Sequence, residues 1–195
     1  MDGLIGTSLG HVFRGRAVVT NFDIALHPGE IVGLLGANGA GKTTIFRILA
    51  GRLRPRAGQV FLDGRDVTRW PLWRRARQGL AYVPQHATVL PRLSVLENID
   101  LGITEDSKVM RIERRQKLVE AFGLETIATQ KGQTLSGGEK RRVELVRALA
   151  GHPRYLIVDE PFAGLDPRAI EDVGEALEQL AATGVGILLT DHNVS

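Results

Sequence analysis

The segment that most constrains the fold of this chain is the glycine-rich stretch between residues 31 and 49. Ile31 to Leu35 is a short apolar run, which is typical of a strand buried on both faces of a sheet. A helical pattern that reaches Leu49 follows the loop Gly36-Ala37-Asn38-Gly39-Ala40-Gly41-Lys42-Thr43-Thr44. A buried strand that passes through a tight loop into a helix is a unit of α/β folds, so we predict an α/β protein.

The residues of this loop suit a phosphate group. Its pattern G-x-x-x-x-G-K-T has glycines that permit positive φ, so backbone N–H groups can close around phosphate oxygens. The N-terminus of the next helix adds the positive end of its dipole. We expect Lys42 to bridge the β- and γ-phosphates of a nucleotide and the Thr43 hydroxyl to bind Mg²⁺. A plain glycine-rich turn with an exposed lysine is disfavoured by the flanking strand and helix.

A second, acidic segment can complete the magnesium site. Tyr155 to Val158 is an apolar run that ends in Asp159 and Glu160. The carboxyl ends of neighbouring strands meet at one edge of an open α/β sheet, so these carboxylates are expected beside the loop. We expect Asp159 to hold Mg²⁺, directly or through water, and Glu160 to orient and deprotonate an attacking water. Taken alone, such a pair is often only a helix-capping turn.

The remaining hydrophobic patterns separate strands from helices along the chain. Residues 22–26 alternate between apolar and polar side chains, which predicts an antiparallel strand near the N-terminus. From about residue 94 to residue 150 the spacing is helical, and another helix is predicted over 166–182. Short apolar runs predict further strands at 59–62, 80–83 and 185–189.

These patterns predict a single domain over residues 1–195. Residues 1–85 and 151–195 would form the α/β core around a mixed sheet, with an antiparallel β subdomain at the N-terminus. Residues 86–150 would form an inserted helical subdomain.

Composition excludes several classes of protein. Hydrophobic residues make up 43% of the chain and charged residues 24%, which is ordinary for a globular protein and argues against disorder. The absence of cysteine excludes a disulfide, a cysteine nucleophile and a thiolate metal site. No run of eighteen apolar residues occurs, so no membrane-spanning segment is expected. The net charge of +3 is interpreted as small and scattered, so no nucleic-acid partner is expected.

The segment Leu135-Ser136-Gly137-Gly138-Glu139 makes the interpretation specific, because it resembles the signature motif of ATP-binding-cassette (ABC) ATPases. Other positions match this family in its own order along the chain. They are Phe13 for the aromatic that stacks on adenine, Gln85 for the Q-loop glutamine, residues 163–166 for the D-loop and His192 for the switch histidine. The resemblance covers essentially the whole chain and implies the ABC-ATPase fold of the P-loop NTPases, with a RecA-like core.

The resemblance also implies a mechanism and the cofactors ATP and Mg²⁺. Two cassettes would pair head to tail, with each ATP between residues 36–44 of one subunit and Ser136, Gly137 and Gly138 of the other. Gln85 would bind Mg²⁺ near the γ-phosphate and transmit its state to the helical subdomain. His192 would contact the γ-phosphate and hold the water and Glu160 in place.

Details of the motifs resemble one branch of the family. The segments 136–144, 159–167 and 190–194 are similar to the cytoplasmic ATPases of bacterial lipopolysaccharide export. We therefore expect a homodimeric ATPase at the cytoplasmic face of the inner membrane, driving separate transmembrane subunits that dock near Gln85 to Arg92. Importers of branched-chain amino acids are the first alternative; they share the Ala-Gly of the D-loop but usually have Glu-His at the switch.

A non-transport ABC ATPase is the second alternative. Chromosomal members insert a long coiled coil between the phosphate loop and the signature, but Ser136 follows Lys42 by only 94 positions here, and no sustained heptads occur. Translation-type members carry two cassettes in one chain, whereas this sequence has one. The transporter subunit is the better match.

Some residues keep a plainer interpretation beside the functional one. Phe13 could be a core or edge aromatic, Gln85 a loop amide and His192 a bystander near a terminus. Leu90 could pack beneath its loop instead of contacting a partner. The chain ends three residues after His192, where family members continue with a further strand and helix, so we expect fraying there, weaker dimerisation and reduced turnover.

Aromatic and basic stretches outside the motifs receive simple expectations. Trp70 and Trp73 are expected to pack at a helix start rather than to stack on a ligand. The basic residues of 74–77 and 111–117 are expected on solvated helix faces, with contact to anionic lipid headgroups as the alternative. Those of 140–142 are expected to add to the field that attracts ATP.

Overall fold

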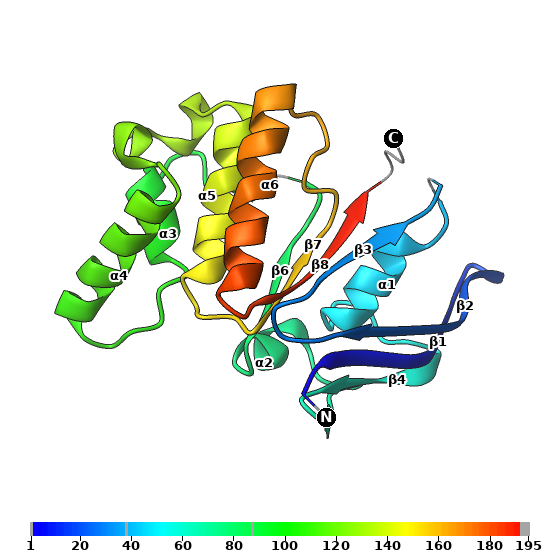
Figure 1. Cartoon of the computed structure of the whole chain (residues 1–195). Helices are drawn as coiled ribbons and strands as arrows, with labels where there is room; N and C mark the ends of the chain where they lie inside the picture. Colours follow the sequence, from blue (N-terminus) through cyan, green and yellow to red (C-terminus); the bar gives the residue numbers. More distant parts are fainter. Residues whose placement is uncertain (1, 38, 87, 192–195) are drawn as a thin grey trace.

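The computed structural model of the chain describes residues 2–37, 39–86 and 88–191 (Figure 1). Its elements in chain order are β1 (Leu4–Phe13), β2 (Arg16–Leu26), β3 (Ile31–Leu35), α1 (Lys42–Leu49), β4 (Ala57–Leu62), β5 (Arg65–Asp66), α2 (Leu72–Ala76), β6 (Leu80–Val83), α3 (Val95–Asp100), α4 (Lys108–Ala121), the 3₁₀ turns η1 (Glu125–Ile127) and η2 (Gly132–Thr134), α5 (Gly137–Leu149), β7 (Tyr155–Val158), α6 (Pro167–Ala182) and β8 (Gly186–Asp191).

The strands form two separate sheets. One is antiparallel in the order β2-β1-β4-β5, and the other is parallel in the order β3-β8-β7-β6. The α/β fold predicted from the sequence is confirmed, as are the strands at 80–83 and 155–158. The burial expected for β3 is wrong, since Ile31 is 43% and Leu35 56% exposed. Within the described residues β3 pairs with β8 alone, and an edge strand has less of its surface covered.

Helix α1 lies between the two sheets (Figure 1). Its side chains Ile45, Phe46, Ile48 and Leu49 are buried in a core shared by residues of both sheets. That core includes Leu4, Leu26 and Val60 of the antiparallel sheet and Tyr155, Ile157 and Leu188 of the parallel sheet. Burial on both sides fixes α1, and with it the loop at the carboxyl end of β3 that leads into it.

The predicted helical stretch between residues 94 and 150 is confirmed as α3, α4 and α5. These helices lie on the side of the parallel sheet away from the antiparallel sheet (Figure 1). A second core joins them to α6 and to the parallel sheet, through side chains such as Val95, Leu118, Val146, Val173 and Leu156. Among the described residues, no helix has the length and apolar content needed to cross a membrane.

The far end of α1 is closed by a buried arginine. Arg75, expected on a solvated helix face, is fully buried, and its guanidinium donates to the carbonyl oxygens of Ile48 at 2.9 Å and Leu49 at 2.5 Å. It also donates to the carbonyls of Trp70 and Thr68. These bonds satisfy carbonyls that the end of a helix leaves free. Burial lowers the pKa of Arg75 to about 10.

A glycine allows this close approach. Gly51 has φ +77°, and a Cβ built there would lie 2.7 Å from the Arg75 Nε and 2.6 Å from the Trp70 carbonyl oxygen. Only a residue without a side chain fits between the end of α1 and the guanidinium.

Candidate active site

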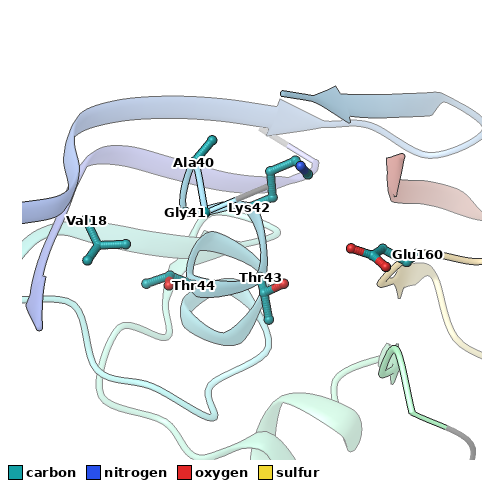
Figure 2. Close-up of a pocket in the computed structure, with 8 residues that line it drawn as sticks. Val18, Ala40, Gly41, Lys42, Thr43, Thr44 and Glu160 are labelled. Carbon is teal, nitrogen blue, oxygen red and sulfur yellow. The ribbon is translucent and has the colours of Figure 1, made fainter. Parts of the chain in front are cut away.

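The phosphate loop and the end of β7 enclose a cavity of about 190 Å³ (Figure 2). Gly41 shows why the loop needs a glycine at this point: it has φ +96°, and a Cβ would lie 2.7 Å from the Val18 carbonyl oxygen of β2. Gly41 also N-caps α1, and no side chain caps its first N–H groups. A helix N-terminus with this arrangement is suited to an anion. The cavity is lined by Val18, Gly39, Ala40, Gly41, Lys42, Thr43, Thr44 and Glu160.

Lys42 is held against its own loop. Its side chain is largely buried, and Nζ donates to the carbonyl oxygens of Gly36 and, at 3.1 Å, Ala37. These bonds place the positive charge at the cavity that the loop surrounds, where a phosphate group would lie. Asn38, the remaining predicted member of the loop, lies outside the described residues.

Asp159 provides a carboxylate beside the Thr43 hydroxyl. The side chain is 1% exposed, and its Oδ1 accepts hydrogen bonds from Thr190 Oγ1 at 2.9 Å and, at a weak 3.5 Å, from Thr43 Oγ1. Its Oδ2 is buried and accepts no hydrogen bond from the described residues. A buried carboxylate oxygen without a partner is costly, so this atom is placed for a cation or a water molecule.

These residues fit Mg²⁺. The ion prefers oxygen ligands and usually combines one or two carboxylates with substrate phosphates and water, rather than a cage made only of protein. Asp159 and Thr43 are of that kind. In the described part of the chain no group of three or more histidine or acidic side chains could hold a metal. With one carboxylate and one hydroxyl, Asp159 and Thr43 suit an ion whose other ligands come from phosphate oxygens and water.

Glu160 is turned toward the phosphate loop by an unusual backbone conformation. It has φ +48°, in the left-handed region that a residue with a side chain rarely adopts. Its N–H donates to Thr190 Oγ1 at 2.8 Å, and its Oε2 accepts from Gln85 Nε2 at 2.5 Å. Figure 2 shows the carboxylate pointing across the cavity toward Thr43 and Lys42. The structure thus brings together Lys42, Thr43, Gln85, Asp159 and Glu160.

The signature residues lie elsewhere in the same chain. Ser136 N-caps α5 in a capping box: its Oγ accepts from the N–H of Glu139 at 3.3 Å, and the Glu139 carboxylate accepts from the N–H of Ser136 at 2.7 Å. The hydrogen bonds from Ser136 lower the pKa of Glu139. Gly137 lines a second cavity, with Gln85 and Glu160. Neither Ser136, Gly137 nor Gly138 lines the phosphate-loop cavity, so this chain does not bring the two motifs into one pocket.

Two other predicted residues are not brought to that pocket. Phe13 ends β1 with 61% of its surface exposed and with the Arg14 guanidinium 5.7 Å from its ring centre, so it is not a core aromatic. It does not line the phosphate-loop cavity. His192 lies outside the described residues.

The sequence analysis missed two groups that hold the site together. Thr190, at the end of β8, bonds both Asp159 and Glu160. Arg141, expected to act as a surface charge, is buried in an ion pair with Glu144 at 3.1 Å. Its guanidinium also donates to the carbonyls of Pro84 and Asp159, the residues after β6 and β7. Thr190 could have been found as Asp159 was, because the carboxyl ends of neighbouring parallel strands meet at one edge of the sheet. The burial of Arg141 could not, because a run of basic residues in a sequence does not indicate which of them is buried.

The sequence is similar to known proteins. The family model described as ABC transporter matches residues 19–163. The chain is 45% identical over 197 residues to the lipopolysaccharide export system ATP-binding protein LptB of Escherichia coli K12, covering 100% of this chain and 82% of that protein. It is 45% identical over 190 residues to LptB of Acidithiobacillus ferridurans, covering 96% of this chain and 78% of that protein.

Solved structures agree with the sequence relatives. The ADP conformation of MJ1267, an ATP-binding cassette of an ABC transporter, matches with a TM-score of 0.89 and 25% identity, over 100% of this chain and 83% of that one. The dimeric structure of MJ0796, a bacterial ABC transporter cassette, matches with a TM-score of 0.86 and 25% identity, over 98% of this chain and 88% of that one. With its phosphate loop, strand-end carboxylates and signature helix in this order, the chain belongs to the ABC transporter family, as an ATP-binding cassette.

Proposed function

We propose that this chain is the ATPase subunit of a lipopolysaccharide exporter and acts as a homodimer at the cytoplasmic face of the inner membrane. The observation that carries the ATPase assignment is that Thr43 and Glu160, which line the phosphate-loop cavity, bond to Asp159 and Gln85 respectively. The assignment to lipopolysaccharide export is supported by 45% identity, over the whole chain, to ATPases of that system.

ATP binding would use the loop residues Gly36 to Thr44. Their N–H groups and the Lys42 ammonium would surround the β- and γ-phosphates. Thr43 and Asp159 would hold Mg²⁺, with Gln85 as a further ligand. When bound there, the ion offsets the charge that develops on the phosphate oxygens. Phe13 would stack on the adenine ring, a role that its exposed surface allows.

Hydrolysis would use Glu160 as the general base. A base has to lie within hydrogen-bond reach of the water that it deprotonates, and the Glu160 carboxylate points into the cavity (Figure 2). Thr190 fixes its backbone and Gln85 its side chain. His192 would contact the γ-phosphate, as its position in the family motif implies.

A second copy of the chain would complete each nucleotide site. The signature residues begin α5, whose N-terminus carries the positive end of the helix dipole and would face the γ-phosphate bound to the other subunit. MJ0796, with the same fold, is described as a dimer. The head-to-tail pair would therefore enclose two ATP molecules.

The transmembrane partner would enter a groove beside the segment Gln85 to Arg92. Two cavities of about 350 Å³ each share Ala81, Tyr82, Arg147 and Ala148, so they form one continuous groove between β6 and α5. Thr88 forms one edge and bonds to Glu144 and Arg147 of α5. Leu90, which could have been buried beneath the loop, is 44% exposed and available to a partner. Ala87, in the same segment, lies outside the described residues.

The test is Mg²⁺-dependent ATP hydrolysis by the wild type and by Glu160→Gln, each followed by size-exclusion chromatography in ATP. Loss of a positioned base should slow turnover by about 10²–10⁴-fold while ATP binding persists and the ATP-bound dimer accumulates. Glu120→Gln on the exposed face of α4 is the matched control and should hydrolyse at the wild-type rate. Equal turnover by Glu160→Gln and the wild type would contradict the role of Glu160.

The transport assignment has its own test. The chain is expressed in a strain depleted of its own lipopolysaccharide-export ATPase, and the Glu160→Gln variant serves as the inactive control. Growth of the strain that expresses the wild type, but not of the strain that expresses Glu160→Gln, would support the assignment. Absence of growth, despite co-purification with the transmembrane subunits, would contradict it.

A further inference from the structure

The segment around α2 is one of the strongly basic parts of the molecule. Residues 65–78 contain five arginines and one aspartate, so this segment has a net charge of +4, more than the +3 of the whole chain. Residues 47–56 and 108–117 each carry the same net charge of +4, so the positive charge is spread over several segments of the chain, as expected. Arg75 is buried, and the other arginines are exposed; they are Arg65, Arg69, Arg74 and Arg77.

Two tryptophans lie among these arginines. Trp73 is 60% exposed, and the Arg77 guanidinium lies 5.3 Å from the centre of its ring. Trp70 is half-buried, with the guanidinium of Arg74 at 3.8 Å and that of Arg65 at 5.8 Å from its ring. The expected packing at the helix start therefore fails for Trp73. Stacking on the rings orders these guanidiniums in advance, which lowers the entropy cost of using them to bind an anion.

The one carboxylate of this segment is already occupied. Asp66 Oδ1 accepts from the Thr68 N–H at 2.9 Å and the Thr68 hydroxyl at 2.6 Å, and Oδ2 accepts from Gln59 Nε2 at 3.2 Å. The hydrogen bonds from Thr68 lower the pKa of Asp66, so it remains ionised. Against four exposed arginines, this single charge leaves the surface strongly positive.

The position of α2 leaves the nucleotide site clear. It precedes β6, at the amino ends of the parallel strands, whereas the phosphate loop follows the carboxyl end of β3 (Figure 1). Leu72, Ala76 and Arg77 of α2 also line the groove beside β6 and α5. The α2 surface therefore continues the groove that the proposed function gives to the transmembrane partner.

We propose that the α2 patch, defined as Arg65, Arg69, Trp70, Trp73, Arg74 and Arg77, binds the anionic headgroups of the bilayer beside that partner. Arginine forms bidentate hydrogen bonds with phosphate groups, and tryptophan favours the membrane–water interface because its ring is apolar and its N–H is polar. The orientation of the patch toward the membrane rests on the proposed function. Its affinity for anionic lipid is a property of this chain alone.

The experiment measures partition of the wild-type chain into vesicles of phosphatidylcholine, with or without 30% phosphatidylglycerol (about one lipid in three). Both tryptophans of the chain belong to the patch, so a blue shift of their emission reports its contact with lipid. Partition should require phosphatidylglycerol. It should fall about fivefold for each arginine removed, hence roughly 25-fold in Arg74→Gln/Arg77→Gln. Trp73→Ser should lose most of the blue shift.

A matched variant separates the patch from general electrostatic attraction. Lys108→Gln/Lys117→Gln removes the same charge from the exposed face of α4 and should keep partition within about twofold of the wild type. Equal losses in both double variants would overturn the proposal. Absence of binding to phosphatidylglycerol vesicles would also overturn the proposal. So would a blue shift of the tryptophan emission that a single-stranded oligonucleotide produces and vesicles do not.

The result can be read apart from the proposed ATPase function. ATP hydrolysis by the wild type is measured in the same preparation without vesicles. Hydrolysis without lipid binding would overturn only the lipid proposal. Lipid binding without hydrolysis would keep the α2 patch and count against the proposed function.

Discussion

At the scale of single residues, Thr190 holds the two acidic side chains of the site in relation to each other. Its hydroxyl donates to the Asp159 carboxylate and accepts from the Glu160 N–H. The left-handed conformation of Glu160 is strained for a residue with a side chain, so it needs support from such a neighbour. Thr190 therefore acts as a positioning residue for both carboxylates.

Replacement of Thr190 by valine tests this role with little change in shape. Thr190→Val removes the hydrogen bond that Thr190 accepts from the Glu160 N–H and the one that it donates to Asp159, which should cost about 1–3 kcal/mol of stability. We expect ATP turnover to fall about tenfold or more, because Glu160 is no longer held toward the cavity. Thr190→Ser keeps the hydroxyl and should retain most of the activity. Turnover assays and urea unfolding check both, and equal turnover by all three proteins would contradict the role.

Sequence reasoning reached some residues of the site and not others. Lys42 and Asp159 could be predicted because their positions follow from a loop pattern and from the end of a buried strand. Arg75 and Arg141 could not, because the same letters occur on solvated helix faces, and only the packed structure decides burial. A charged residue can be buried where carbonyl oxygens or a carboxylate surround it. These groups come from distant parts of the sequence and are brought together only by the tertiary structure.

At the scale of elements, two helices of the helical region begin with the same device. Ser94 caps α3 and Ser136 caps α5, each with a capping box completed by a glutamate three positions later. Only Ser136 belongs to the signature motif. The pair therefore offers a comparison between a cap that stabilises a helix and a cap that would also contact a nucleotide.

Ser94→Ala and Ser136→Ala should each lower the free energy of unfolding by about 1 kcal/mol. Ser136→Ala should in addition weaken ATP-dependent dimerisation, because the hydroxyl is proposed to face the phosphate bound to the other subunit. Ser94→Ala should dimerise as the wild type does. Chemical denaturation and sedimentation in ATP measure the two effects. If the two variants dimerise equally well, Ser136 only caps its helix and does not contribute to the contact with the nucleotide of the other subunit.

The buried pair of Arg141 and Glu144 lies where α5 meets the ends of β6 and β7. Arg141→Met leaves the Glu144 carboxylate buried without its charged partner, which should destabilise the chain by about 3–5 kcal/mol. Arg141→Met/Glu144→Leu removes both charges and should recover part of that loss in urea unfolding. A double variant no more stable than the single one would show that the bonds to the Pro84 and Asp159 carbonyls, rather than the ion pair, dominate.

At the same scale, the type of each element, helix or strand, was more predictable than its burial and its position in the sheet. The strand at 80–83 and the helix begun by Asp166 were predicted because local patterns determine them. The exposure of β3 was not, since an apolar run does not reveal its position in the sheet. Position in a sheet depends on which strands pair, and that depends on the whole chain.

At the scale of the whole molecule, one cluster ties the two sheets together. Asp63, in the turn between β4 and β5, accepts hydrogen bonds from the Tyr155 hydroxyl of β7 at 2.6 Å and from the Gly3 N–H at 3.1 Å. Its carboxylate also pairs with Arg154. Burial, then the hydrogen bond to Asp63 and its negative charge, raise the pKa of Tyr155 well above its usual range.

This raised pKa predicts a loss of stability in alkali. An unfolded chain ionises its tyrosines near pH 10, whereas folded Tyr155 keeps its proton, so the contribution of Tyr155 is complete below pH 10. It is lost progressively as the pH rises above that value. Tyr155→Phe cannot ionise, so its stability relative to the wild type should improve between pH 9 and pH 11. Urea unfolding across that range measures the difference, and parallel curves would contradict the prediction.

The buried guanidinium of Arg75 has a mechanical consequence. It binds carbonyls at the end of α1 and carbonyls of residues 68 and 70, and it belongs to α2 itself. These bonds link the three segments directly, so a force on the outer surface of α2 would be transmitted through Arg75 to the helix that follows the phosphate loop. Anything that holds α2 in place would therefore also restrain α1 and the phosphate loop that leads into it.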